Sequence, residues 1–296
     1  MWAGVTERFR RFHNLLYLTA DEIADGLGKQ VGVRQSLQRA YWGPTTDDPP
    51  GFVVGSWGKK TAIRPPNDID LFMPLPLDVY HRFETYAGNR QSSLLQEVKN
   101  NLRNTYPQTN MRGDGQVVVV AFNTITIEVV PVFRWDDVGT WLMPDTNVGG
   151  RWKLVYPGDE IVSLDGADAA GNNNCRPLIQ IIKAWKAHCN VPIKSFHIEQ
   201  LVTEFVRTYQ YRNQSYFYYD WFVRDLLRFL IGQRSARIYA PASNEVISIG
   251  EEWYGRALTA YDRAVEACEH EYQDRIIMAG EEWQKLFGPR IPSYLG

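Results

Sequence analysis

The chain has 296 residues, of which 44% are hydrophobic and 13% aromatic, a composition that excludes a disordered protein and suffices for one large domain or two lobes. A formal net charge of -2 excludes the overall basic field that binds long nucleic acid, so a small phosphorylated substrate fits better. Three widely spaced cysteines favour neither a disulfide framework nor a cysteine-rich zinc site. With no signal peptide and no apolar run long enough for a membrane span, we expect a cytoplasmic protein.

Two helices are expected over residues 5–42. Thr19 and Glu22 have the spacing of a capping box, which predicts that the second helix begins there. The segment 43–51 contains three prolines and two glycines and should end that helix.

Two short strands are expected next in the chain. The first covers FVVGS, residues 52–56, and runs into a turn, and the second covers DIDLFMPLP, residues 68–76. Residues 80–104 have a helical pattern.

The segment 112–133 has the clearest strand pattern in the chain. Residues 117–122 and 125–133 are rich in β-branched and aromatic side chains and flank Asn123, which predicts an antiparallel hairpin. Because strand side chains alternate between faces, Glu128 should lie in mid-strand on the face opposite Ile127 and Val129.

From Arg176 onward the pattern is helical. Helices are expected over four segments, 178–188, 196–209, 220–230 and 253–276. The arrangement is therefore a mixed sheet lobe followed by a helical lobe.

Three carboxylates are the first candidates for chemistry. Asp68 and Asp70 stand two residues apart on a strand and point to one face, where they repel each other unless a cation lies between them. Oxygen ligands of this kind suit Mg²⁺ or Mn²⁺. An isolated Asp-x-Asp is more often a solvated strand end, but Glu128 offers a third carboxylate on another strand.

The connection before the Asp-x-Asp strand supplies groups for a phosphate. Gly55 and Ser56 lie at a strand-to-helix turn, where a glycine lets backbone N–H groups approach a phosphate. Lys59, Lys60 and Arg64 add positive charge. Three carboxylates can hold two metal ions for phosphoryl or nucleotidyl transfer, which requires positioning and charge neutralisation and no covalent nucleophile.

Three blocks together resemble one enzyme family. They are GSWGKKTAIRPPNDIDLFMPLP, GDGQVVVVAF with TIEVVPVF, and LIQIIKAWKAHCNVPIKSFHIEQLV. Within the polymerase-β-like nucleotidyltransferases they are similar to the bacterial cGAS/DncV-like nucleotidyltransferases, the CD-NTases of anti-phage (CBASS) signalling. Lys60 stands where a glycine is expected, and the third carboxylate is Glu128 rather than an aspartate.

The resemblance implies an α+β fold with the active site in a cleft between a sheet lobe and a helical lobe. Its divisions would be 1–42, the N-terminal helices packing across both lobes; 43–170, the catalytic core; and 171–296, the helical lobe with the C-terminal tail.

The activity that the resemblance implies is the joining of nucleoside triphosphates into cyclic di- or trinucleotides with release of pyrophosphate. Asp68, Asp70 and Glu128 would be catalytic and bind two Mg²⁺ ions, with Mn²⁺ as an alternative. Gly55, Ser56 and Lys59 would bind the donor triphosphate. A downstream effector activated by the cyclic product would be a partner, whereas neither a membrane nor long double-stranded DNA is expected.

The helical lobe would contribute three further nucleotide-binding residues. Lys183 and Ser195 match the family pair that grips phosphates, and Phe196 stands where relatives place an aromatic ring that stacks on a base. From the residues alone, Lys183 would be a solvated lysine and Ser195 a helix N-cap, and Phe196 could equally be a core residue.

The C-terminal Gly296 raises a separate hypothesis. In some systems of this family the C-terminal residue is conjugated to targets by an associated E1/E2-like enzyme, and Gly296 could serve in this way, although a chain end alone needs no such role. Two other functions stay open, a nucleotidyltransferase acting on RNA, a protein or a small molecule, and a catalytically silent nucleotide-binding protein.

Overall fold

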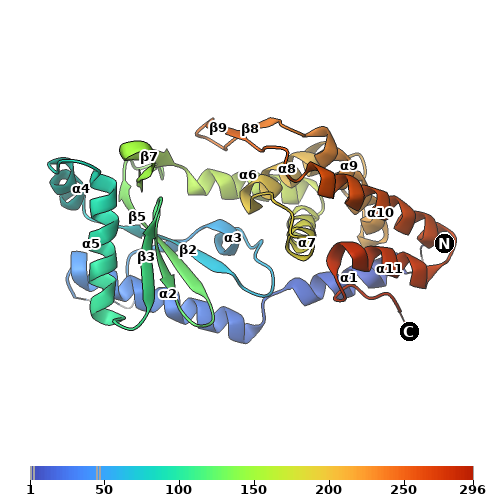
Figure 1. Cartoon of the computed structure of the whole chain (residues 1–296), viewed down its shortest axis with the longest axis horizontal. Coiled ribbons are helices and arrows are strands. Elements are labelled where there is room, and N and C mark those ends of the chain that lie inside the picture. Colours follow the sequence, from blue (N-terminus) through green and yellow to red (C-terminus); the bar gives the residue numbers. More distant parts are fainter. Residues whose placement is uncertain (1, 3, 45, 47, 296) are drawn as a thin grey trace. The chain divides into compact units, whose positions relative to one another are not determined.

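The computed structural model describes residues 2, 4–44, 46 and 48–295. The chain divides into two compact units, one of Met1–Tyr17 with Glu160–Gly296 and the other of Leu18–Asp159 (Figure 1). The first is mainly helical and the second contains a seven-stranded sheet.

The sheet unit begins with a long helix and then alternates strands with short helices. Its elements are α2 (Ala20–Tyr41), β1 (Phe52–Val53), α3 (Gly55–Gly58), β2 (Asp68–Pro74), α4 (Leu77–Glu84), α5 (Arg90–Thr105), β3 (Asn110–Asp114), β4 (Val117–Ala121), β5 (Thr126–Arg134), β6 (Trp141–Asp145), the 3-10 turn η1 (Asn147–Gly149) and β7 (Arg151–Val155).

The strand order is β1-β2-β5-β4-β3, and β6 extends the sheet by pairing with β5 and β7. The central pair, β2 and β5, is parallel, whereas every other pair in this sheet is antiparallel. The two strands that carry the predicted carboxylates are therefore direct neighbours.

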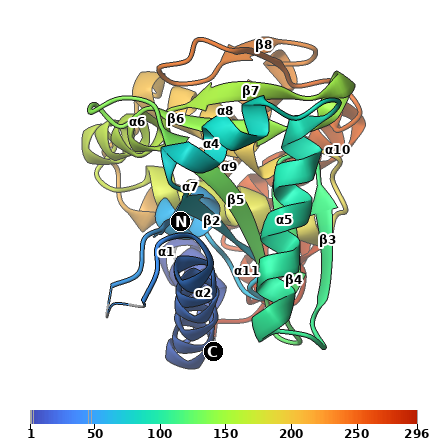
Figure 2. The ribbon, with the colours of Figure 1, turned by 90° about the vertical axis from the view of Figure 1, so that its left-hand side faces the viewer.

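The two faces of this sheet have different environments. One face packs against helices in the main core, to which β2 contributes Ile69, Leu71 and Met73, and α5 lies over this face with α4 above it (Figure 2). Side chains that alternate with these point to the other face. There, Asp68 and Asp70 are followed along β2 by Phe72, which belongs to a second, smaller apolar cluster with Val54, Val130, Val132 and Met143.

The helical unit is built around large buried aromatic side chains. Its elements are α1 (Val5–Leu16), most of α6 (Pro157–Ala170), α7 (Cys175–His188), α8 (Ser195–Thr208), the 3-10 turn η2 (Tyr216–Tyr218), α9 (Tyr219–Gly232), β8 (Arg237–Tyr239), β9 (Val246–Ser248), α10 (Tyr254–Tyr272) and α11 (Ile276–Phe287). Trp185, Trp253 and Trp283 are almost fully buried in its core.

A buried arginine joins the two ends of this unit. Arg8 of α1 has no exposed side-chain surface, and its Nε donates to Oε1 of Glu271 at 3.0 Å. Its Nη1 and Nη2 donate to the carbonyls of Pro292, Ser293 and Ile276. The C-terminal tail is thus fastened to the first helix.

Several predictions about local structure are confirmed. The capping box is present, since Thr19 N donates to Oε2 of Glu22 at 2.7 Å and Glu22 N donates to Oγ1 of Thr19 at 3.2 Å. The two predicted N-terminal helices are α1 and α2, and the predicted hairpin is the antiparallel pair β4 and β5.

Two predictions were wrong in detail. Residues 80–104 lie in two helices instead of one, because the chain turns at 85–89 and the Asn89 side chain accepts a hydrogen bond from Ser92 N to begin α5. The region after Arg176 is not helical throughout, since β8 and β9 form a small antiparallel hairpin.

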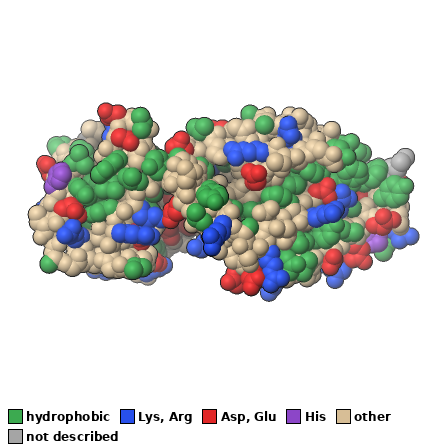
Figure 3. Space-filling view, turned by 90° about the horizontal axis from the view of Figure 1, so that it is seen from above, with side chains coloured by type: hydrophobic (Ala, Val, Ile, Leu, Met, Phe, Trp, Pro, Cys, Tyr) green, Lys and Arg blue, Asp and Glu red, His purple; other side chains and the backbone are tan. Residues whose placement is uncertain are grey.

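Acidic and basic side chains are interspersed on the face of the molecule drawn in Figure 3. Within the described part of the chain, the helices lack the combined length and apolar character that crossing a membrane requires.

Candidate active site

The parallel pairing of β2 and β5 brings the predicted carboxylates to neighbouring positions on one face. Asp70 is the register partner of Glu128, and Asp68 is paired with Thr126. Adjacent strands lie about 4.8 Å apart, so the side chains of register partners on one face are neighbours. All three carboxylates are half-buried, at the same end of the central strand pair.

The electrostatic environment of Glu128 reflects this crowding. Burial raises its pKa to about 7, and the negative charges of Asp68, Asp70 and Asp114 act in the same direction, whereas Arg112 opposes them. A carboxyl group with such a pKa is in part protonated at neutral pH. A cation placed among these groups would favour their ionised forms.

The residue types at this site suit a hard divalent cation. Carboxylate oxygens are the ligands that Mg²⁺ prefers, and the pKa of Glu128 is raised first by burial and then by the negative charges of Asp68, Asp70 and Asp114, which a cation would offset. Among the described residues, no three His, Cys, Asp or Glu side chains already converge as a metal-binding group. The donor chemistry therefore fits the ion, although the three side chains do not yet form a ready-made binding group.

The turn before α3 passes directly beside Asp70. Gly55 has a φ of +58°, and a Cβ atom at this position would lie 1.7 Å from Oδ2 of Asp70. The backbone also joins the two segments, because Val54 N donates to the carbonyl of Asp70 at 2.9 Å. Only glycine supplies both the left-handed conformation and the space that the carboxylate occupies.

The turn after Gly55 is tightly closed on itself. The N–H groups of Thr61 and Ala62 donate to the carbonyl of Ser56 at 2.8 and 3.1 Å, and Lys59 N donates to the carbonyl of Gly55 at 3.0 Å. Ser56 itself is half-buried. The predicted strand-to-helix turn is confirmed, with β1 on one side and α3 on the other.

The three basic side chains of this connection occupy different environments. Lys59 is buried, Lys60 is exposed, and Arg64 pairs with Glu22 of α2 through contacts of 3.0 and 2.9 Å. Lys60 has a φ of +59°, the left-handed conformation that favours glycine. The lysine that stands here in place of the expected glycine therefore has a cost in backbone conformation.

The predicted residues of the helical unit lie together on α7 and α8. Lys183 is not solvated: its Nζ lies 2.6 Å from Oε1 of Glu199, and both side chains are about 95% buried. Ser195 is the first residue of α8 and not its N-cap, because Lys194 occupies the cap position. Nζ of Lys186 donates to Oγ of Ser195 at 3.2 Å.

Phe196 is half-buried, with its ring centroid 6.5 Å from that of His197. The ring is therefore neither a fully buried core residue nor fully exposed. Gly296 lies outside the described residues.

Two charged residues on the edge strand β3 were not predicted. Arg112 is paired across β4 with Val119, which is paired in turn with Glu128. Arg112 and Asp114 therefore share the face of the carboxylates. The sequence offered only a weak signal, in which the polar residues Asn110, Arg112 and Asp114 alternate with Met111 and Gly113, and a five-residue polar strand is easily taken for a loop.

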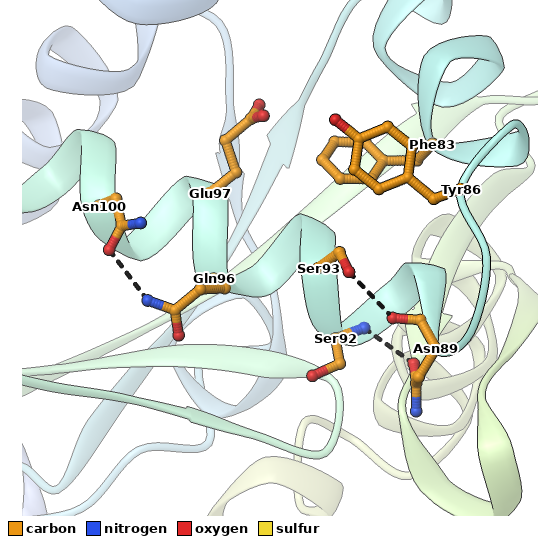
Figure 4. A pocket seen from close by; sticks show the side chains of 8 residues that line it. All are labelled: Phe83, Tyr86, Asn89, Ser92, Ser93, Gln96, Glu97 and Asn100. Carbon is orange, nitrogen blue, oxygen red and sulfur yellow. Dashed lines mark hydrogen bonds between the residues drawn. The ribbon is translucent and has the colours of Figure 1, made fainter.

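A separate cavity of about 550 Å³ lies between the end of α4 and the outer side of α5 (Figure 4). Its walls carry the Phe83 and Tyr86 rings and mostly polar side chains of α5, including Glu97 and Asn100. Because α5 covers the main-core face of the sheet, this cavity is on the opposite side from the carboxylates.

Comparison with known proteins points to one family. The family model of the Second Messenger Oligonucleotide or Dinucleotide Synthetase domain matches residues 4–167, more than half of the chain. A search of curated proteins finds no match.

Solved structures resemble the chain over nearly its whole length. CdnC of E. coli MS115-1 with ATP is 17% identical over 100% of both chains, with a TM-score of 0.68. CdnC in complex with HORMA-deltaN is 16% identical over 98% of both chains, also at 0.68. The Vibrio cholerae cyclic AMP-GMP synthase DncV, a prokaryotic cGAS homolog, is 12% identical over 97% of this chain and 96% of that chain, at 0.74. The α+β fold expected from the sequence is therefore confirmed.

Proposed function

Since the chain belongs to the Second Messenger Oligonucleotide or Dinucleotide Synthetase family, we propose that it joins nucleoside triphosphates into cyclic di- or trinucleotides and releases pyrophosphate at each bond. The observation that carries this proposal is the register of β2 and β5, which makes Asp70 the partner of Glu128 and keeps Asp68 on the same face.

The metal-binding role belongs to the three carboxylates in this proposal. Asp68, Asp70 and Glu128 would hold two Mg²⁺ ions, with Mn²⁺ as a substitute. The bound ions would supply charge neutralisation at the triphosphate and acidify the attacking hydroxyl. The half-buried setting of the carboxylates supports this role, because the effective dielectric constant there is lower than in water, which strengthens their attraction for a cation.

The Gly55–Ser56 turn would receive the donor triphosphate. Its close approach to Asp70 brings backbone N–H groups beside a carboxylate that would hold metal, so one phosphate could contact both. Ser56 would add a hydroxyl donor. Lys59 would contribute a nearby positive charge, although it is largely buried.

The helical unit would provide a second set of phosphate and base contacts. Ser195 at the N-terminus of α8, with Lys186 hydrogen-bonded to its hydroxyl, is suited to an anion because the first N–H groups of a helix lack intrahelical acceptors. Lys183 would act from its ion pair with Glu199, and Phe196 would stack on a base.

The biological setting we propose is cytoplasmic anti-phage signalling, in which the cyclic product activates an effector. CdnC has been seen in complex with HORMA-deltaN, and a regulatory protein partner of this kind is part of the proposal. An E1/E2-like enzyme acting on Gly296 is a further candidate partner.

The test is product identification with the full chain. Purified protein is incubated with four radiolabelled nucleoside triphosphates and Mg²⁺ or Mn²⁺, then with phosphatase, and resistant products are identified by mass spectrometry. We expect a cyclic product that is absent for Asp68→Ala. Pyrophosphate release only after addition of RNA, protein or a small acceptor would instead support the alternative transferase. Nucleotide binding without release under any of these conditions would support a silent binder.

A further inference from the structure

Residues 59–67 connect α3 to β2 and are held by backbone hydrogen bonds near both ends. Near the start, two N–H groups of the connection donate to the carbonyl of Ser56 at 2.8 and 3.1 Å. At the end, Thr126 N of β5 donates to the carbonyl of Asn67 at 3.4 Å, which is long for a hydrogen bond. Asp68 follows as the first residue of β2. A proposed metal ligand therefore lies at a strand end that the backbone holds weakly.

A side-chain ion pair fastens the middle of this connection to α2. Nε of Arg64 lies 3.0 Å from Oε1 and 2.9 Å from Oε2 of Glu22. The two residues that follow Arg64 are prolines, whose φ angles are fixed near about −65°, so few freely rotating bonds separate Arg64 from Asp68. The position of the guanidinium therefore bears on the position of the Asp68 carboxylate.

Glu22 is itself held in place before it meets Arg64. Thr19 N donates to Oε2 of Glu22 at 2.7 Å, and Glu22 N donates to Oγ1 of Thr19. Burial raises the pKa of Glu22, but hydrogen bonds from Thr19 and Arg64 outweigh it, so the carboxyl is ionised at neutral pH. An exposed ion pair contributes little where both side chains lose freedom on pairing. Here the capping box has already removed that freedom from one partner.

We propose that Glu22 and Arg64 are positioning residues, which hold the connection 59–67 so that Asp68 stays where it can bind metal together with Asp70. The inference rests on the proposed function and deepens it. In this role Arg64 acts through the backbone and does not contact phosphate, although positive charge on this connection suggested a phosphate contact from the sequence. Its charge is offset by Glu22 instead.

Three variants of the full chain form a double-mutant cycle. Glu22→Gln removes the charge that pairs with Arg64 and keeps a side chain that can close the capping box. Arg64→Met removes the guanidinium and keeps an unbranched side chain, and the third variant combines both changes. The matched control is Glu97→Gln. Its partner Arg82 is 43% exposed, close to the 40% of Arg64, and this pair lies on the other side of the sheet from the carboxylates.

Metal affinity is measured first, because it needs no turnover. Mn²⁺ is titrated into each protein, the free ion is followed by its EPR signal, and Asp68→Ala shows how much of the binding belongs to the carboxylates. We expect Glu22→Gln and Arg64→Met each to weaken this binding about three- to fivefold, the upper range for an exposed ion pair. The combined variant should bind no more weakly than either single variant, and Glu97→Gln should match wild type.

Hydrogen exchange reports on the connection itself. The amides of Thr61 and Ala62 should exchange faster in Glu22→Gln and in Arg64→Met, because the connection has lost its attachment to α2, and Glu97→Gln should leave them unchanged. Unchanged exchange at these amides would overturn the proposal. So would an unchanged Mn²⁺ affinity, or losses that add in the combined variant, since independent effects exclude action through the pair.

Turnover separates positioning from phosphate contact. If wild type makes a cyclic product, Glu22→Gln and Arg64→Met should lower kcat by the same factor at low Mg²⁺, with KM for nucleoside triphosphates changed by less than about twofold. Saturating Mg²⁺ should restore most of the loss, which a merely structural defect would not allow. A raised KM in Arg64→Met alone would show phosphate contact and overturn the proposal.

The two proposals fail in different ways. Normal product formation with unchanged metal affinity in Glu22→Gln and Arg64→Met would reject the positioning role and leave the synthase assignment intact. Absence of product from every protein, with the expected metal affinities and exchange rates, would reject the synthase assignment and retain the positioning role.

Discussion

The backbone of Gly55 lies against the carboxylate of Asp70, with no room for a side chain between them. A Cβ atom at residue 55 would lie 1.7 Å from Oδ2 of Asp70, and φ at this residue is +58°. The turn and the proposed metal ligand are therefore in direct contact, and a change in one displaces the other.

Gly55→Ala tests this contact. We expect synthesis to fall at least about 100-fold and the free energy of unfolding to fall by about 2 kcal/mol, because the added methyl group displaces the carboxylate and strains the backbone. Gly88→Ala is the matched control, since Gly88 has a φ of +79° and open space at Cβ. It should lose only about 1 kcal/mol and keep full activity. Equal activity losses in both variants would disprove a special role for the Asp70 contact.

Asp68→Asn and Asp70→Asn should each abolish synthesis without unfolding the protein. Both replacements keep the shape of the side chain but remove a negative charge beside Glu128, whose pKa these charges raise. In metal-free buffer we expect equal or higher thermal stability, by up to about 1 kcal/mol, because repulsion is relieved. Activity assays and thermal melts check this, with Asp78→Asn of α4 as a control. Near wild-type turnover in either variant would reject the metal assignment.

Lys60→Gly should stabilise the chain. Lys60 adopts a φ of +59°, which costs a residue with a Cβ atom about 1 kcal/mol and costs glycine almost nothing. After the greater flexibility of glycine in the unfolded state is counted, we expect a gain of about 0.5 kcal/mol. Lys60→Ala removes the same charge without relieving the backbone and should show no gain in denaturant unfolding. If both variants gained equally, the cause would be charge.

Variants of the Lys183–Glu199 ion pair distinguish a structural role of Lys183 from a role in phosphate binding. Lys183→Met leaves a buried carboxylate without its 2.6 Å partner and should cost about 3 kcal/mol. The double variant Lys183→Met with Glu199→Leu should recover most of this stability. If Lys183 also contacts phosphate, the double variant will keep a raised KM for nucleoside triphosphates. A double variant with wild-type stability and KM would leave Lys183 a structural residue only.

The helical unit should become less stable as the pH rises towards neutrality. Asp220 of α9 is 1% exposed, and burial, with the negative charge of Glu271 as a further cause, raises its pKa from 3.8 to about 7. The unfolded carboxyl loses its proton near pH 4 while the folded one keeps it, so the stability that Asp220 contributes is fully present below about pH 4 and is lost progressively up to about pH 7. The pKa of Glu271 is also raised by burial, which adds to this trend. At Asp220 the positive charge of Arg224 lowers the pKa and so opposes the trend.

Asp220→Asn removes this proton equilibrium. The variant should be about 2–4 kcal/mol more stable than wild type at pH 8, and the difference should shrink towards pH 4. Urea unfolding at several pH values measures it. If the free energies of unfolding of the two proteins changed with pH in parallel, the pKa of Asp220 would not differ between the unfolded and folded states.

Local sequence signals predicted much of the fold. The capping box of Thr19 and Glu22 depends on residues three apart, and the β4–β5 hairpin depends on two adjacent apolar runs, so both are visible in short segments. Asp68, Asp70 and Glu128 were found because two of them are close in sequence and the third interrupts a strongly apolar strand.

Long-range pairing was harder to predict. The parallel register that makes Asp70 the partner of Glu128 joins strands separated by two helices and a hairpin, and no local pattern determines it. Likewise, Lys183 looked solvated because its partner Glu199 is on the next helix. Arg112 escaped notice because its strand is short and polar and lies at the edge of the sheet.

Arg8 and Glu271 are 263 residues apart in sequence, yet their side chains share one buried contact, to which the carbonyls of Ile276, Pro292 and Ser293 also belong. During synthesis the first helix emerges from the ribosome long before these partners exist. The buried guanidinium therefore has none of these acceptors until residues 271–293 have been synthesised. Completion of this unit is then a late step of folding, and α1 must avoid aggregation until that step.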